Sequence, residues 1–266
     1  MLAKTAARTA LALSFIAAPL LAQSGLPGYA ASNGKYRITT SAKTSQVVMG
    51  TPQDFENAAN QLVSVAVQKA GDAYALTMTL DSAAMTTTAP GQSTDPGDAI
   101  GMKLSGRMTP DGKASATEVT AKAGGTPTSP LAANMRSFLP RLKIGATKGA
   151  MWVDSVIYAG KSGNSDVTTT TVATYTLAGD TTVAGQSAWK IISTSASTVT
   201  GVGIQMGSAY TLEGNVKGQG IAVLSAGGVL LGITSNSETR INVVVAAANM
   251  TIPITTTQTA RIDKLP

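Results

Sequence analysis

The sequence predicts an all-β protein of mainly antiparallel strands, and three features of the chain support this class. Thr and Ser are abundant, whereas strong helix formers are sparse beyond the first 22 residues, and β-branched residues suit a pleated strand. Several runs alternate apolar and polar residues, and turn residues separate them. We expect one curved sheet or half-barrel, built from two similar halves with one short helix at the seam between them.

The strands are clearest in the first half of the chain. From Tyr74 to Leu80 every second residue is large and apolar, which is the period of a half-buried strand, and Gly71-Asp72 just before it is a turn signal. The same alternation runs from Met102 to Met108, and Pro110-Asp111-Gly112 then predicts a tight turn into a partner strand.

Residues 1–22 have the pattern of an export signal. Lys4 and Arg8 are followed by an apolar run over 11–21, which is too short for a membrane span of about 20 residues. Cleavage sites fit after Ala22 and after Ala30. Residues 23–33 are small and polar, and we expect a flexible N-terminal tail there.

The chain contains no cysteine, so it has no disulfides, no thiolate metal ligands and no lipidated cysteine. We therefore expect a periplasmic or secreted protein without a lipid anchor. Loss of the signal would lower Lys+Arg from 20 to 18 against 14 acids, which leaves a net charge of +4. This balance lacks the sharp basic cluster of a nucleic-acid binder, and we expect no nucleic-acid partner.

The domain prediction is a single β domain over 34–266. Its two half-repeats would span 34–125 and 146–266, joined by a helix and linker over 126–145. The helix is predicted at Leu131–Phe138, because Pro140 would end it.

An internal duplication is suggested by a shift of the sequence by 108 residues. It places Ala70-Gly71-Asp72 on Ala178-Gly179-Asp180, and the pair Leu104 and Gly106 on Leu212 and Gly214. Chance similarity between strands rich in Ala, Gly and Thr is the alternative.

Signatures of catalysis are absent from the sequence. There is no histidine, which excludes a Ser-His-Asp triad and histidine metal ligands. Ser187 and Lys190 match an S-x-x-K motif, but Ser187 lies in a strand-like run where that nucleophile should open a helix. Asp54 and Glu56 flank Phe55, and we interpret them as solvated loop acids. We expect a non-enzymatic protein without cofactor or metal.

The seam is rich in basic residues, which two interpretations explain. A solvated charged linker is favoured, and peripheral contact with an anionic surface such as lipid headgroups is the alternative. The residues concerned are Arg136, Arg141, Lys143 and Lys148.

A resemblance to known proteins is carried by Leu139-Pro140, Gly145, Trp152 and Asp154, and loosely by the closing run Thr251 to Leu265. A Leu-Pro pair before a Gly-x-Trp strand is similar to a pattern in uncharacterised exported bacterial β-rich proteins. The predicted architecture also resembles the half-barrels of periplasmic lipoprotein carriers. That resemblance implies a concave apolar face able to hold an acyl chain.

Two functions follow from these expectations. The first is binding of a lipid or other apolar or amphipathic small molecule on a concave β face. The alternative is a structural or surface-interaction protein with a fully packed interior. We expect Trp152 to anchor the seam more strongly than Trp189, and the oligomeric state stays open. The wall of the ligand site is predicted to comprise Tyr74, Leu76, Met78, Met102, Leu104, Met108, Trp152 and Trp189.

Overall fold

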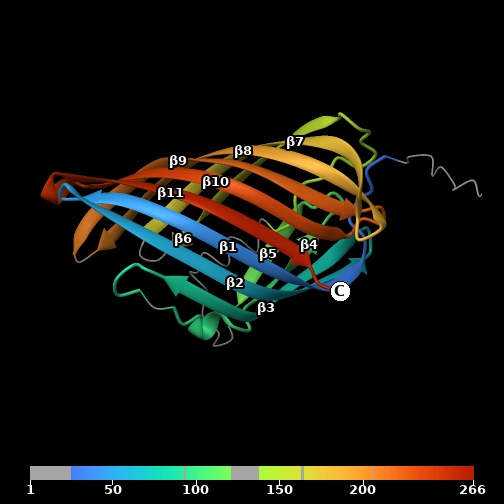
Figure 1. The fold of residues 1–266 in the computed structure, drawn as a ribbon, viewed down its shortest axis with the longest axis horizontal. Coiled ribbons are helices and arrows are strands. Elements are labelled where there is room, and N and C mark those ends of the chain that lie inside the picture. Colours follow the sequence, from blue (N-terminus) through green and yellow to red (C-terminus); the bar gives the residue numbers. More distant parts are fainter. Residues whose placement is uncertain (1–24, 93, 121–137, 163–164, 206) are drawn as a thin grey trace, which may run out of the picture.

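Eleven antiparallel strands form one curved sheet in the computed structural model, which describes residues 25–266 except 93, 121–137, 163–164 and 206 (Figure 1). Two short 3-10 turns, η1 (Gly97–Ala99) and η2 (Ala246–Ala248), are the helical elements among the described residues. The all-β, antiparallel prediction is confirmed. The strands are β1 (Ser32–Val48), β2 (Thr51–Ala70), β3 (Ala73–Thr87), β4 (Lys103–Met108), β5 (Ala114–Thr120), β6 (Met151–Ser162), β7 (Ser165–Val183), β8 (Gln186–Gln205), β9 (Ser208–Ser225), β10 (Leu230–Val245) and β11 (Met250–Lys264).

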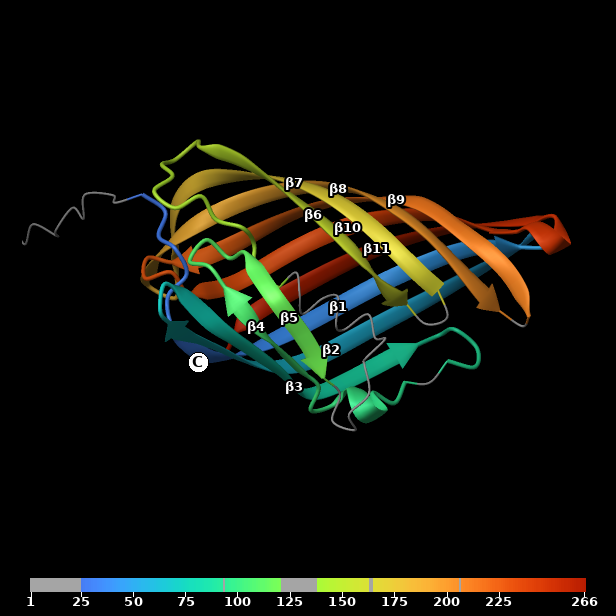
Figure 2. The ribbon, with the colours of Figure 1, turned by 180° about the vertical axis from the view of Figure 1, so that it is seen from behind.

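The strand order is β5-β4-β3-β2-β1-β11-β10-β9-β8-β7-β6. Consecutive strands are therefore neighbours in the sheet, except β5 and β6, which lie at opposite edges; β1 and β11 pair with each other in the middle. Within the described residues β5 and β6 are the two edges. Figure 2 shows both edge strands on the open side of the curved sheet.

Alternation of side chains gives the sheet an inner, concave face and an outer face. In β1, Tyr36 and Ile38 point inward and are buried, whereas Lys35 and Arg37 point outward and are exposed. A shift of one residue would exchange the two sets, so the pattern fixes the pairing register. The turn between β2 and β3 supports it, because Gly71 has φ +67°, which favours glycine.

The hydrophobic core lies at one end of the inner face. We call this the near end; it carries the β2–β3, β7–β8 and β9–β10 turns, and the opposite end of the strands is the far end. Residues from outside the strands complete the core: Leu26, Phe138 and Leu142 are 0–4% exposed. The rings of Phe138 and Tyr36 meet edge to face at 5.2 Å. The sheet alone therefore does not form the core.

The segment 25–31 differs from the flexible tail predicted over 23–33. Leu26 is fully buried, its N–H donates to the Ala146 carbonyl at 2.7 Å, and its carbonyl accepts from the Gly145 N–H at 2.8 Å. Tyr29 is buried as well, and its hydroxyl donates to the Pro140 carbonyl at 2.8 Å. Backbone pairing and apolar burial together order a stretch that has no local pattern.

The two-half organisation is not confirmed. The described residues form five strands before the seam and six after it. Gly71 lies in a hairpin turn, but its proposed counterpart Gly179 lies inside β7, where the pairing with β8 shifts register. The predicted helix at Leu131–Phe138 falls outside the described residues except for Phe138, which lies in a bend. The predicted signal over 1–22 falls outside them as well.

Candidate binding surfaces

The eight residues predicted to form a ligand wall come together at the near end. Six of them are buried members of the core cluster, with exposures of 0–8%: Leu76, Met78, Met102, Leu104, Met108 and Trp189. The remaining two, Tyr74 and Trp152, are partly buried against that cluster. In the described residues this set therefore belongs to the hydrophobic core or packs against it.

Arg141 connects the seam to two neighbouring elements. Its Nη1 lies 2.9 Å from Asp111 Oδ1 and its Nε lies 3.7 Å from Asp154 Oδ1. Its carbonyl accepts a hydrogen bond from Trp152 Nε1 at 2.9 Å, and the Trp152 ring stacks on Tyr175 at 5.5 Å. Arg141 therefore links the seam to the turn after β4 and to β6 at the near end.

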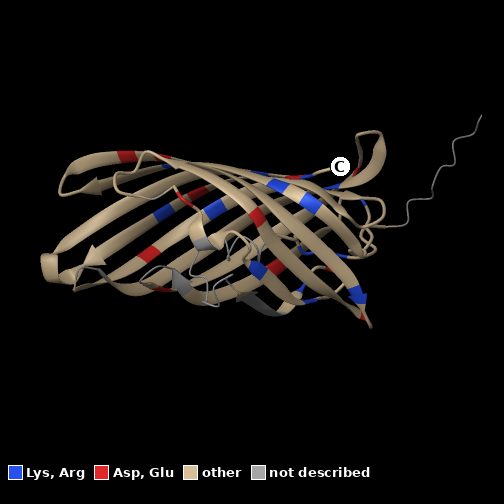
Figure 3. Cartoon of the chain, turned by 90° about the horizontal axis from the view of Figure 1, so that it is seen from below, with Lys and Arg blue, Asp and Glu red and all other residues tan. Residues whose placement is uncertain are grey.

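The other basic residues of the seam do not join this network. Lys143 and Lys148 are exposed, and Arg136 lies outside the described residues. The four cations predicted as one basic group are therefore not shown to form a single surface. Figure 3 shows charges of both signs interspersed along the strands.

The shifted pKa values at the near end follow from burial and pairing. Burial raises the pKa of Tyr36 to about 12, and burial, with smaller contributions from Tyr175 and Tyr36, raises the pKa of Tyr29 well above its usual value. Partial burial acts to raise the pKa of Asp111, but the Thr109 hydroxyl and Arg141 together bring it below the usual value. Each shift moves the pKa of the group further from neutral pH.

Beyond the core, the inner face is lined by small side chains. In β8, Trp189 and Ile191 point into the core, so the alternate residues Ser193 and Ser195 also face inward. The same argument applies to β9 and β10 from Ala222 and Ile233. We define the inner belt as Ser193, Ser195, Gly218, Gly220, Ser235 and Ser237.

A pocket of about 380 Å³ lies on the inner face at the far end. Phe55 of β2 and Ile254 of β11 face inward and supply apolar surface, and the loop residue Pro90 contributes to the wall. The rim is uncharged and rich in amides. We call this the far-end pocket; its lining is Thr44, Gln46, Gln53, Phe55, Asn57, Ala89, Pro90, Gln92 and Ile254.

Local contacts hold the far-end pocket in shape. Gln46 Nε2 donates to Gln53 Oε1 at 2.8 Å across the β1–β2 hairpin. The loop that follows β3 is anchored to β2, because the Thr88 N–H donates to the Glu56 carbonyl at 3.0 Å and the Glu56 N–H donates to Thr88 Oγ1 at 2.8 Å. These two hydrogen bonds, one to the backbone and one to the side chain of Thr88, hold the loop beside the strand that carries Phe55.

The sequence offered only a weak signal for this pocket. The sequence predicts a loop position for Asp54 and Glu56, but both belong to β2. Strand alternation points Phe55 inward and sends Asp54 and Glu56 to the outer face, where Glu56 Oε1 lies 2.7 Å from Lys43 Nζ. The two acids therefore do not converge on the pocket.

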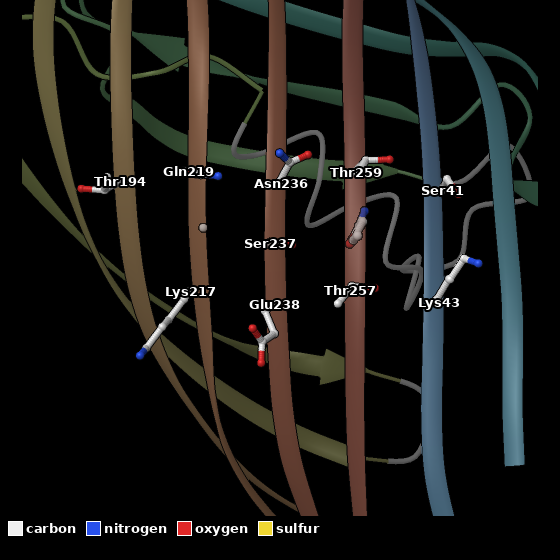
Figure 4. A pocket seen from close by; sticks show the side chains of 12 residues that line it. Ser41, Lys43, Thr194, Lys217, Gln219, Asn236, Ser237, Glu238, Thr257 and Thr259 are labelled. Atoms are coloured by element: carbon white, nitrogen blue, oxygen red, sulfur yellow. The ribbon is translucent and has the colours of Figure 1, made fainter. Parts of the chain in front are cut away.

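A second depression, of about 500 Å³, crosses the outer face of β8, β9, β10, β11 and β1. We call it the outer saddle. Figure 4 shows its side chains spread over these strands, with Thr194, Gln219, Asn236 and Thr259 forming one row. Lys217 and Glu238 are direct cross-strand partners. Glu238 forms an exposed ion pair with Arg240 of the same strand, and exposed pairs contribute roughly 0–1 kcal/mol to stability.

The described residues contain no group of three or more His, Cys, Asp or Glu placed to hold a metal ion. None of the helices in the described part of the chain has the length and apolar character needed to cross a membrane.

Comparison with known proteins yields neither a protein family nor a curated relative that matches the chain. Among solved structures, Neisserial surface protein A is similar at a TM-score of 0.24 and 7% identity, over 89% of this chain and 99% of that one. A DUF1329 family protein from Desulfovibrio piger is similar at a TM-score of 0.24 and 10% identity, over 86% of this chain and 83% of that one.

Proposed function

We propose that this chain is an exported, non-enzymatic protein that binds an amphipathic small molecule on the inner face of its sheet. The apolar part of the ligand would contact Phe55 and Ile254 in the far-end pocket, and its polar part would extend toward the inner belt. The observation that carries the proposal is the segregation of the inner face. An apolar pocket floor on β2 and β11 and a belt of small side chains on β8, β9 and β10 lie on the same inner face of the sheet.

The size and chemistry of the far-end pocket suit such a ligand. Small-molecule sites commonly measure roughly 300–1,000 Å³, and this pocket has about 380 Å³. Its amides offer both donors and acceptors without charge, so an uncharged polar group can bind without desolvating an ion. The small residues of the inner belt leave room on the concave side of the sheet, whereas the near end is filled by the protein's own side chains.

An uncharged monoacylglycerol with a ten-carbon chain is a direct probe of this proposal. Native mass spectrometry of the exported protein should show a bound amphiphile, and isothermal titration should show saturable binding of the probe. Ile254→Trp would fill the pocket and should weaken binding at least tenfold. Thr255→Trp is the matched control, because it adds the same ring on the outer face of the same strand and should leave binding unchanged.

The outer saddle supports a second candidate, a surface-interaction protein that meets a polar partner across β8–β11 and β1. If the probe does not bind and the purified protein carries no adduct, the binding proposal fails and this second function is favoured. Equal effects of Ile254→Trp and Thr255→Trp would likewise remove the far-end pocket as the site.

A further inference from the structure

The outer face of β6, β7 and β8 carries a charge-free apolar patch. Its large side chains are strongly exposed: Met151 61%, Val153 65%, Ile157 70%, Val172 45% and Ile192 40%. The pairing registers place Val172 opposite Ser155. Met151 is opposite Thr176, which is in turn opposite Ile192, so Met151 and Ile192 lie two strands apart in one row. We call these five residues the outer apolar patch.

The contrast with the rest of the outer face is sharp. Outward positions at 151–159 of β6, 168–176 of β7 and 192–200 of β8 contain no charged residue. On the same outer face, farther from the β6 edge, the outward positions of β9, β10, β11 and β1 include charges of both signs, such as Lys217 and Glu238. Exposed large apolar residues also occur at other outward positions, such as Val47 of β1 and Val244 of β10, but the outer apolar patch is the one without charges among its outward neighbours. A contiguous exposed apolar patch marks an interaction site.

The edge itself identifies the kind of partner. β6 pairs only with β7 among the described residues, and within that part of the chain no strand pairs with the backbone groups on its other side. Sheet edges are usually protected by Pro, Lys, a bulge or a short strand. β6 is 12 residues long and contains no Pro, its register with β7 runs without a shift, and its single Lys, Lys161, lies at the far end of the strand, outside 151–160. A strand satisfies these backbone groups, whereas a lipid surface offers no matching donors.

We propose that β6 pairs antiparallel with β6 of a second copy of this chain, about a two-fold axis through Ser155. An axis perpendicular to the sheet keeps both outer faces on one side, so the two apolar patches become continuous. It also places Val153 opposite Ile157 of the partner subunit, twice by symmetry. A surface without charge meets its own copy without electrostatic repulsion. The charged outer face of β9, β10, β11 and β1 would not.

The chain has no cysteine, so single cysteines report the pairing directly. Ser155→Cys lies on the two-fold axis and should form a disulfide-linked dimer under mild oxidation. Ala159→Cys is the register control, since the proposed pairing places Ala159 opposite Met151 rather than opposite itself. Thr251→Cys, exposed on the outer face of β11, controls for random collision. Both controls should cross-link at least tenfold more slowly.

Sedimentation velocity of the unmodified protein gives the second measurement. A dimer is expected at micromolar concentration, and Val153→Lys combined with Ile157→Lys should convert it to a monomer of unchanged circular dichroism. Thr174→Lys, on the same face but one strand away from the edge, should retain the dimer. A monomer at all concentrations, or equal cross-linking of the Ser155 and Ala159 cysteines, overturns the proposal. Binding of the monomer to lipid vesicles or coverage of the edge by another part of the same chain would give that result.

Discussion

The two ends of the same long strands differ in what their inner side chains do. In β8 the near end contributes Trp189 and Ile191 to a buried core, and a few residues later Ser195 and Ser197 face the same side. The strand is continuous through this change, so the backbone does not distinguish the ends. Side-chain size alone divides one concave face into a region packed with large apolar side chains and a region lined by small ones.

A second difference lies in what covers each end. The near end is closed by Leu26, Phe138 and Leu142, which come from outside the sheet. The far end has the loop 88–92 beside Phe55, and a pocket remains between them. Stability should therefore be concentrated at the near end, and substitutions there should cost much more than matched substitutions at the far end.

The strongest test of this contrast is Trp189→Ala. Trp189 is 8% exposed, and loss of a buried Trp side chain costs about 3–5 kcal/mol. Trp152 is only partly buried, so Trp152→Ala should cost less, which reverses the order that the sequence suggested. Urea denaturation at neutral pH measures both. A larger loss for Trp152 would mean that the seam, and not the core, dominates the near end.

Leu104→Ala and Ile254→Ala compare the near and far ends at side chains smaller than tryptophan. Leu104 is fully buried, and we expect a loss of about 2–5 kcal/mol in the free energy of unfolding. Ile254 is partly exposed in the far-end pocket, and its truncation should cost roughly 1 kcal/mol. Thermal or chemical denaturation gives the two values. Equal losses would contradict the division of the inner face.

Tyr36→Phe should remove about 0.5–1.5 kcal/mol, because the Tyr36 hydroxyl donates to the Leu230 carbonyl at 3.0 Å. It should also change the alkaline behaviour. The pKa of tyrosine in an unfolded chain is about 10, whereas burial raises the pKa of Tyr36 in the folded protein to about 12. The folded state therefore binds more protons in this window, and its stability falls as the pH rises through it.

The variant should lose less stability than the wild type when the pH is raised from 10 toward 12, with denaturation curves as the measurement. Tyr29, also buried with a raised pKa, remains and keeps part of the alkaline loss. Parallel alkaline profiles for wild type and variant would show that Tyr36 is not protected from ionisation.

The smallest expected effect belongs to Asp111→Asn, which leaves Arg141 with Asp154 as its remaining acidic partner. Both side chains are partly exposed, so we expect a loss of roughly 0.5–1 kcal/mol at neutral pH. The pKa of Asp111 is lowered on folding, so its contribution is present above about pH 4 and is lost as the pH falls through the lowered pKa. The variant should therefore show a flatter acid profile; an unchanged one would exclude this contribution.

The sequence predicted the fold class because strand alternation is local. The run from Tyr74 to Leu80 and the turn at Gly71 were both readable from a few neighbouring residues, and both are in the structure. Which residues outside the strands complete the core could not be predicted from neighbouring residues in the sequence. Leu26 and Tyr29 look like part of a polar tail, and only contacts with Ala146 and Pro140, more than 100 residues away, bury them.

Candidate sites were harder to predict than strands for the same reason. Large apolar residues were predicted as a ligand wall, but their partners outside the sheet make them core. Phe55 stands between two acids in a polar stretch, so its inward direction depends on β2 continuing through this region. Arg141 was interpreted as part of a solvated linker, because its contacts with Asp111 and Asp154 come from two other elements.

The central pairing of β1 with β11 has a consequence for the route by which the chain folds. Thr44 and Thr256, 212 residues apart, share a hydrogen bond of 2.9 Å across these strands. All other neighbouring strands in the sheet are consecutive in the chain. Two hairpin meanders can therefore form early from local contacts, and closing the longest loop in the molecule joins them last. Until then β1 and β11 are both open edges, and slow refolding with a tendency to exchange strands between molecules is the expected kinetic signature.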